Sequence, residues 1–257
     1  MISRRNFSLS CSVAAVVPIL VSPALADSDE NICAAFTPEL QKATTPDHAI
    51  ALLKAGNDRF AAGKSTECDL LGSLKATAGK QSPFACVLGC IDSRAAPELV
   101  FDQQIGDIFS ARVAGNIVDV NNLGSFEFAT KVAGAKAIVV LGHTSCGAVK
   151  GAVDNVRIAD NLTSLLSTIM PAVEETPLQG ERSSKNHQFV ENVAEANVRR
   201  NVKALTERST VLKELVDSGA LKIVGAMFDL HTGKVTDRKS TRLNSSHGGI
   251  SRMPSSA

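Results

Sequence analysis

The fold is decided by the segment 84–149, which contains Phe84-Ala-Cys-Val-Leu-Gly-Cys-Ile-Asp-Ser-Arg94 and Ala137-Ile-Val-Val-Leu-Gly-His-Thr-Ser-Cys-Gly147. Each of the two stretches opens with a short apolar run and ends in soft or ionisable side chains. Short apolar runs rich in β-branched residues are typical of buried parallel strands. Functional side chains of open α/β sheets gather at the carboxyl ends of the strands, so we expect the two polar ends to meet.

Cys90, His143 and Cys146 would then bring two thiolates and one imidazole to the same edge of the sheet. This set of ligands suits Zn²⁺. Three protein ligands leave a fourth position for water, which is typical of a catalytic zinc site rather than a structural one. A lone cysteine in a strand is more often a small buried hydrophobe, so the prediction of one zinc ion per chain rests on the three residues together.

Two charged residues, Asp92 and Arg94, follow Cys90 closely. A buried strand end would otherwise exclude charge. In an extended chain, residues 90, 92 and 94 point the same way. We therefore expect the Asp92 carboxylate and the Arg94 guanidinium to lie beside the metal and to pair with each other.

These residues belong to a set of motifs that resembles the β-class carbonic anhydrases. The motifs are Cys-x-Asp-Ser-Arg, Gly-Asp-x-Phe with Arg-x-Ala-Gly-Asn, and Gly-His-x-x-Cys-Gly-Ala, which stand here at 90–94, 106–109, 112–116 and 142–148. The resemblance reaches from about residue 46 to residue 235. It implies an α/β fold with a mostly parallel central β-sheet flanked by helices, and a zinc enzyme that interconverts carbon dioxide and bicarbonate.

The resemblance also implies self-association as a dimer or tetramer, with an N-terminal helical arm that packs across the partner. Here the arm contains a helix that should start at Thr45-Pro46-Asp47, because a capping hydroxyl, a proline and an acid follow one another. The family has a glutamine that binds substrate or inhibitor just before the first strand, where Gln81 stands; an ordinary loop amide is the alternative. We assign Gly147 to the substrate site as well, directly behind the ligand Cys146.

The expected mechanism is the attack of a zinc-bound hydroxide on carbon dioxide. Asp92 would accept a hydrogen bond from the zinc-bound water or hydroxide, and Arg94 would keep Asp92 ionised and oriented. Whether Asp92 itself ligates zinc in a closed state, as in part of the family, is left open, as is the residue that shuttles protons. Two alternatives remain: hydrolysis of carbon disulfide or carbonyl sulfide on the same site, and a non-catalytic zinc-binding protein.

Residues 1–26 resemble an exported leader. Ser3-Arg4-Arg5-Asn6-Phe7 is similar to a twin-arginine motif, an apolar stretch follows at 13–21, and Ala24-Leu25-Ala26 offers a small-x-small cleavage site. The apolar stretch is shorter than the roughly 20 residues that a membrane-spanning helix needs. We therefore expect cleavage near Ala26 and a periplasmic or otherwise exported protein, without stable membrane insertion.

Residues 237–257 resemble an in-frame translation of a widely used sequencing-library adapter, on both sides of an index-like Gly248-Gly249. A natural polar, disordered tail would have a similar composition. We interpret the tail as non-native and disordered, and residues 27–236 as one carbonic anhydrase-like domain.

Cys33 and Cys68 could form a disulfide in an oxidising compartment, or could be unrelated thiols; the sequence leaves both open.

The chain of 257 residues has 27 basic and 26 acidic residues. The leader holds two of the basic residues, and the tail holds four basic residues and one acidic residue, so the predicted domain has 21 basic and 25 acidic residues. A mildly acidic body argues against nucleic acid as a partner. The remaining helices are expected at 123–132, from 147 onward, at 161–173 and at 186–205, with a last helix that finishes at 212–216; strands are expected at 221–228 and from 234.

Overall fold

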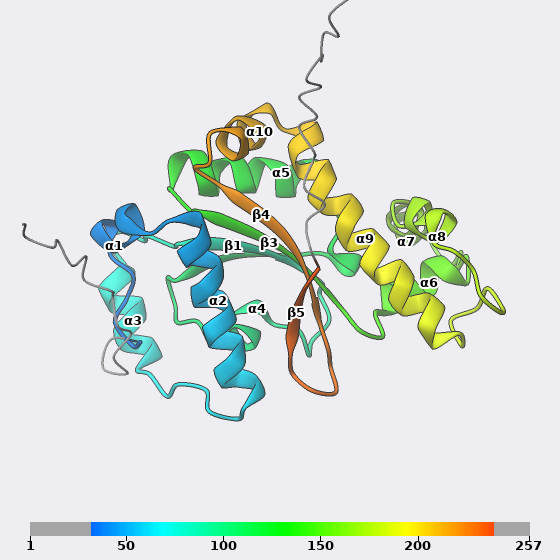
Figure 1. Ribbon diagram of the computed structural model, residues 1–257, viewed down its shortest axis with the longest axis horizontal. Coiled ribbons are helices and arrows are strands. Elements are labelled where there is room, and N and C mark those ends of the chain that lie inside the picture. The colour runs from blue at the N-terminus through cyan, green and yellow to red at the C-terminus, as the bar shows by residue number, and fades with distance from the viewer. Residues whose placement is uncertain (1–31, 239–257) are drawn as a thin grey trace, which may run out of the picture. The chain divides into compact units, whose positions relative to one another are not determined.

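A computed structural model of the protein describes residues 32–238, so the predicted leader and residues 239–257 lie outside the described part. Its centre is a five-stranded sheet with the strand order β2-β1-β3-β4-β5 (Figure 1). The strands are β1 Ala85–Gly89, β2 Ile108–Arg112, β3 Ala137–His143, β4 Lys222–Phe228 and β5 Val235–Arg238. The first four are parallel, and β5 is antiparallel to β4. The predicted mostly parallel sheet is confirmed.

The helices are α1 Pro38–Ala43, α2 Pro46–Ala61, α3 Leu70–Thr77, α4 Pro97–Val100, α5 Val120–Glu127, α6 Gly147–Val153, α7 Asp160–Ser167, α8 Met170–Glu175, α9 His187–Arg208 and α10 Thr210–Asp217. A short 3₁₀ turn, η2 Ala114–Asn116, follows β2, and a π-helical turn, η3 Phe128–Val132, extends α5. No helix within residues 32–238 has the length and apolar character that would let it cross a bilayer.

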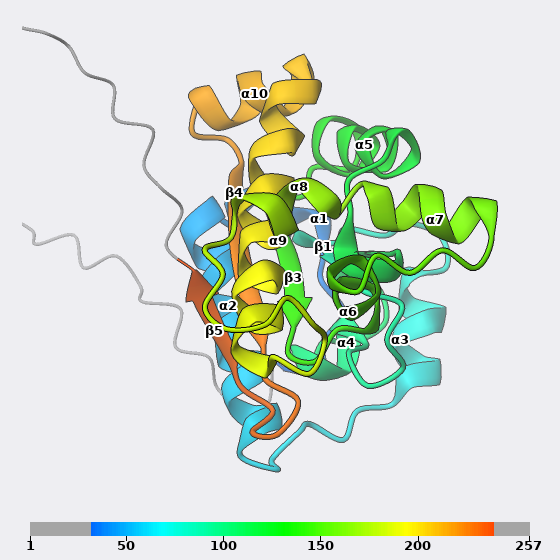
Figure 2. The ribbon, with the colours of Figure 1, turned by 90° about the vertical axis from the view of Figure 1, so that its right-hand side faces the viewer.

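Both faces of the sheet are covered, so β1 and β3 are buried along their whole length. Val87 and Val139 point into a core that includes residues of α2 and α4. Their neighbours Leu88 and Val140 point into the opposite core, which includes residues of α5, α6, α8, α9 and α10. Figures 1 and 2 show α2 and α9 on the two sides of the sheet. The alternation follows from the two-residue period of a strand.

Helix α2 begins as expected, because the Thr45 hydroxyl accepts a hydrogen bond from the His48 N–H at 3.2 Å. It ends just before Gly63, whose φ of 67° is the left-handed conformation that glycine adopts at least cost. In the middle of the helix, Gly56 lets α2 approach the segment after α4. A Cβ at this position would lie 1.8 Å from the Phe101 carbonyl oxygen, so only glycine fits.

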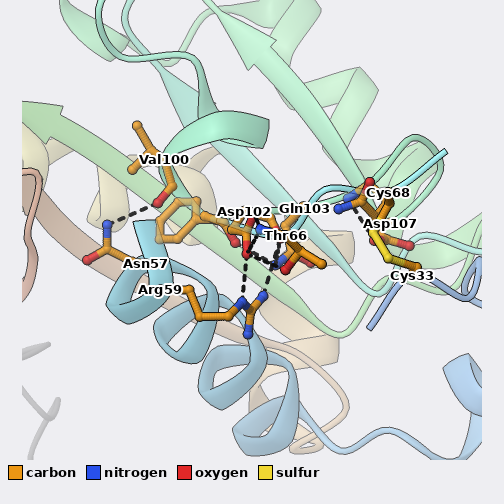
Figure 3. A network of polar contacts seen from close by, with 11 residues as sticks. Cys33, Asn57, Arg59, Thr66, Cys68, Val100, Asp102, Gln103 and Asp107 are labelled. Carbon is orange, nitrogen blue, oxygen red and sulfur yellow. Dashed lines mark hydrogen bonds and ion pairs between the residues drawn. A yellow bond between two sulfur atoms is a disulfide. The ribbon is translucent and has the colours of Figure 1, made fainter. Parts of the chain in front are cut away.

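A buried carboxylate, Asp102, ties α2 to the chain that follows α4 (Figure 3). Arg59 of α2 donates from Nε to Asp102 Oδ2 at 2.6 Å, and the Thr66 backbone N–H donates to Asp102 Oδ1 at 3.0 Å. Asp102 is only 7 % exposed and has a φ of 48°. Its buried charge is thus matched by donors, and the ion pair fixes the N-terminal helical arm next to the segment that leaves the predicted site.

Two expectations about secondary structure need correction. The helix predicted at 161–173 is two helices, α7 and α8, because Pro171 has no N–H for a continuous helix and stands instead in the first turn of α8. Helices α1 and α3 were not predicted. The strand β5 includes Asp237 and Arg238, so the prediction that residues 237–257 are disordered is wrong for these two residues, which pair with β4. Backbone pairing accepts almost any side chain, so this pairing does not test the origin of the tail.

Cys33 and Cys68 form a disulfide, which decides the alternative that the sequence left open. Their Cα atoms are 5.4 Å apart, and the bridge closes a loop over a sequence separation of 35 that contains α1 and α2. A cross-link of this kind stabilises a protein mainly by restricting the unfolded chain. The N-terminal arm is therefore held by a covalent bond as well as by the Arg59–Asp102 ion pair.

We predict that the double substitution Cys33→Ser and Cys68→Ser lowers the free energy of unfolding by about 3–4 kcal/mol, the chain-entropy value for a loop of this length. Denaturant unfolding of the zinc-saturated protein measures the difference. A reductant should destabilise the wild type to the same extent and leave the double variant unchanged. Equal unfolding midpoints for the oxidised wild type and the double variant would contradict this prediction.

Candidate metal centre

The register of β1 and β3 brings the predicted ligands together. Leu88 lies opposite Val140, so both strands reach their carboxyl ends side by side. Cys90 follows β1 directly, and His143 is the last residue of β3. Cys146 is the N-cap of α6 and thus returns to the same edge after a two-residue bridge.

The three ligand atoms of Cys90, His143 and Cys146 lie within 4.8 Å of one another, and all three residues are buried. In a tetrahedral zinc site with Zn–S bonds of about 2.3 Å, two sulfur atoms are about 3.8 Å apart. The observed cluster is therefore close to the size that one zinc ion requires.

His143 presents the correct nitrogen for a metal. Its Nδ1 lies 2.9 Å from the Thr144 carbonyl oxygen, which can only accept, so Nδ1 carries the proton. Its Nε2 is buried and has no hydrogen-bond partner among residues 32–238. A buried imidazole nitrogen without a partner is energetically unfavourable. The lone pair on Nε2 is suited to binding a metal ion.

The two thiols are also prepared for a cation. Donation from the Cys146 thiol lowers the pKa of Cys90, to which the Gly115 N–H also donates at 3.3 Å. The adjoining Cys90 sulfur in turn raises the pKa of Cys146, although N–H groups of Ala148 and Val149 at the start of α6 act in the opposite direction. Two sulfur atoms so close together share one proton, and a divalent cation can take the place of that proton. The residues present therefore fit zinc.

Asp92 and Arg94 form the expected ion pair. Arg94 donates from Nε to Asp92 Oδ1 at 3.0 Å and from Nη2 to Oδ2 at 2.8 Å. Hydrogen bonding from Arg94 holds the pKa of Asp92 well below its usual range, so the carboxylate is ionised. Asp92 Oδ2 also lies 3.9 Å from His143 Nε2, which places the carboxylate at the edge of the metal cluster.

The backbone behind this ion pair differs from the expectation. We predicted an extended chain from Cys90 to Arg94, but the strand ends at Gly89 and a turn follows. The Arg94 N–H donates to Asp92 Oδ1 at 3.0 Å, so the aspartate side chain itself stabilises the turn. Arg112 supports the turn as well, because it donates to the carbonyl oxygens of Cys90 at 2.9 Å and of Asp92 at 2.6 Å.

The two residues assigned to substrate binding, Gly147 and Gln81, lie at different distances from the metal cluster. Gly147 opens α6 next to Cys146, is exposed, and has open space where a Cβ would stand. Gln81 is exposed in the loop that precedes β1, so it lies at the amino end of the strand whose carboxyl end carries Cys90. A strand of five residues spans roughly 17 Å. Within one chain, Gln81 is therefore remote from the metal cluster, and its assigned role stays a prediction.

Three polar residues of α9 contact the loops of the cluster and were missed by sequence reasoning. Glu191 accepts from the Ser145 N–H at 2.8 Å, and Asn197 donates to the Gly115 carbonyl oxygen at 2.8 Å. Asn201 accepts from the Val118 N–H at 2.7 Å. Asn197 and Asn201 interrupt an apolar helical stripe at positions where Val or Ala would otherwise continue it, and this was the available signal.

Comparison with known proteins agrees with this geometry. Residues 85–235 match the carbonic anhydrase family. The chain is 36 % identical over 199 residues to carbonic anhydrase 2 of Mycobacterium tuberculosis, which covers 76 % of this chain and 94 % of that protein. It is 36 % identical over 196 residues to the carbonic anhydrase of Mycolicibacterium smegmatis, with 75 % and 93 % covered.

Solved structures extend the comparison to the fold. The β-carbonic anhydrase CafA of Aspergillus fumigatus superposes with a TM-score of 0.59 at 29 % identity, over 76 % of this chain and 91 % of that one. A tetrameric β-carbonic anhydrase of Sordaria macrospora gives a TM-score of 0.59 at 25 % identity, over 74 % and 95 %. The chain belongs to the carbonic anhydrase family, and its sheet and Cys-His-Cys cluster place it in the β class.

Proposed function

We propose that this protein hydrates carbon dioxide reversibly to bicarbonate and a proton and uses one zinc ion per chain. The observation that carries the proposal is the buried cluster of Cys90, His143 and Cys146 with the ionised Asp92 at its edge. A site that only stored zinc would not need the Asp92–Arg94 pair. The sequence identity to carbonic anhydrases over three quarters of the chain supports the same reaction.

The chain provides a buried set of metal ligands with one charged ion pair beside it. When bound, zinc supplies Lewis acidity that lowers the pKa of a water molecule, which becomes the nucleophile for carbon dioxide. Cys90 and Cys146 would hold the ion as thiolates, and His143 would hold it through Nε2. Two thiolates bring two negative charges to the site and so weaken this acidification, which makes an additional acceptor for the water's hydrogen useful.

Asp92 is the acceptor that we assign. Its carboxylate is ionised, is 14 % exposed and faces the cluster, so it can orient a water molecule by accepting a hydrogen bond at Oδ2. Arg94 engages both oxygens, which fixes the carboxylate and keeps it from protonation. Because the Arg94 side chain is 59 % exposed, the pair also lies on the side of the cluster that solvent and substrate reach.

Stopped-flow hydration of carbon dioxide tests the proposal, with zinc content determined on the same sample. We expect zinc near one per chain and rapid hydration for the wild type. Asp92→Asn should keep the zinc and lower turnover by about 100-fold or more, the range of a lost general base or acceptor. Asp58→Asn, an exposed aspartate of α2, is the matched control and should be unchanged.

Two results would contradict this function. A wild type that holds zinc but hydrates no carbon dioxide would indicate another substrate or a binding role. Unchanged turnover in Asp92→Asn would remove the assigned role of Asp92 while leaving the reaction intact.

We also propose that the chain self-associates through the edge formed by β2, α3 and α5. Strand β2 is an edge strand of the sheet and leaves backbone groups open on one side. Exposed apolar side chains are found on α5 and η3, namely Val120 by 73 %, Phe128 by 53 % and Val132 by 71 %, and on α3, namely Leu70, Leu71 and Leu74. An open cavity of about 750 Å³ lies between β2 and α5. A second copy of the chain would cover this surface. The Gln81 side chain of that second copy could then reach the metal cluster of the first.

Light scattering coupled to size-exclusion chromatography tests this association. We expect a dimer or tetramer for the wild type and a shift toward monomer for Phe128→Lys with Val132→Lys, because charge cannot be buried in an apolar interface without a large penalty. Ile158→Lys is the control, since Ile158 is 79 % exposed on the segment between α6 and α7. A monomeric wild type, or an unaltered mass for the double variant, would contradict this interface.

Export through residues 1–26 remains a proposal that the Cys33–Cys68 disulfide supports, because such bonds persist in oxidising compartments. The N-terminal sequence of the mature protein tests it: a start near Asp27 is expected, and a retained leader in a cytoplasmic protein would contradict it.

Translation of an adapter remains the proposed origin of residues 237–257, and resequencing of the gene beyond codon 236 would test that origin.

A further inference from the structure

Helix α9 carries polar side chains toward the bridge between the ligands His143 and Cys146 and toward the loop that donates a hydrogen bond to the ligand Cys90. It lies against β3 and β4, on the face of the sheet opposite α2 (Figure 2). Most of its inward side chains are apolar, as a helix on a sheet requires, but Glu191, Asn197 and Asn201 are exceptions. All three bind backbone groups outside their own helix.

The first contact holds the bridge between His143 and Cys146. Ser145 has a φ of 56°, a conformation that non-glycine residues adopt only when contacts enforce it. Its N–H donates to Glu191 Oε1 at 2.8 Å. On the other side of the bridge, the Thr144 N–H donates to the Phe228 carbonyl oxygen at 3.0 Å. The two residues between the ligands are thus anchored to α9 on one side and to the end of β4 on the other.

A glutamate at position 191 is energetically unfavourable unless its carboxyl group makes a specific interaction. Its Oε2 is buried and has no hydrogen-bond partner among residues 32–238. A carboxyl group with one unpaired buried oxygen is less favourable than an apolar side chain on the same face of the helix. The contact with Ser145 is therefore the specific interaction that this carboxylate supplies.

The second contact holds the loop that faces Cys90. Asn197, which is 2 % exposed, donates to the Gly115 carbonyl oxygen at 2.8 Å, and the Gly115 N–H donates to Cys90 Sγ at 3.3 Å. Asn201 donates to Asn197 Oδ1 at 3.1 Å, so it orients the Asn197 amide with its nitrogen toward Gly115. A Cβ on Gly115 would come within 2.6 Å of Ile169 Cδ1, so this loop also has no space to move away.

We propose that Glu191 and Asn197 are positioning residues of the zinc site. The two side chains are six residues apart on one rigid helix, a rise of about 9 Å, so α9 sets the separation between the His143–Cys146 bridge and the loop opposite Cys90. The helix thereby preorganises ligands from two strands for one ion. The inference rests on the zinc site of the proposed function and adds residues that do not touch the metal themselves.

Zinc affinity, measured by competition with a chelator of known strength, tests the inference without reference to catalysis. Glu191→Met and Asn197→Leu keep the side-chain size and remove the hydrogen bond. Each should weaken zinc binding by about 10-fold or more, the range for outer contacts of metal ligands. Glu191→Gln retains an oxygen acceptor for Ser145 and should restore affinity close to that of the wild type.

Matched controls come from the same helix. Asn192→Leu changes an exposed residue, and Glu195→Met changes a partly exposed one; both should bind zinc like the wild type. The absorption spectrum of the Co²⁺-loaded protein reports ligand geometry independently, and it should change in Glu191→Met and Asn197→Leu but not in the controls. Thermal unfolding of the zinc-free variants separates lost affinity from a general loss of stability.

If Glu191→Met does not fold, Glu191→Asp keeps the charge and shortens only the reach, and it should still weaken zinc binding. Folded variants at 191 and 197 with wild-type zinc affinity and wild-type cobalt spectra would overturn the inference. A wild type that binds no zinc would instead overturn the proposed function, so the two failures are distinguishable.

Discussion

The parallel pairing of β1 with β3 is the constraint on which the rest of the site depends. Their register ends both strands at the same edge, and neighbouring strands are only about 4.8 Å apart, so Cys90 and His143 start within reach of one ion. A shift of one residue would exchange the two buried faces of a strand. The observed register therefore fixes which side chains face each core and where the ligands lie.

Burial of the ligands has to be compensated by nearby hydrogen-bond donors and acceptors. The Thr144 carbonyl oxygen sets the tautomer of His143, the Gly115 N–H supports the sulfur of Cys90, and the start of α6 supports Cys146. On the solvent side of the cluster, Asp92 pairs with Arg94. The result is a buried set of ligands beside an ion pair that solvent reaches, an arrangement that suits hydration chemistry.

Several features were predictable because their causes are local. The apolar runs of β1 and β3, the threonine and proline at the start of α2, and the ligand types can be recognised within a few residues. The pairing of Asp92 with Arg94 was predicted correctly from a wrong backbone conformation, because the aspartate side chain forms a turn that strand geometry did not include. The break before α8 had a local signal in Pro171, which the apolar periodicity of 161–173 concealed.

The sequence by itself determined which residues can bind zinc, which segments are buried strands and which family the motifs resemble. Only the tertiary structure decided what supports and completes that site. Glu191 and Asn197 meet their partners across 46 and 82 residues of chain, and Gln81 lies at the opposite end of β1 from Cys90. Spacing along the chain determines local geometry, but which distant backbone groups meet depends on how the helices pack on the sheet.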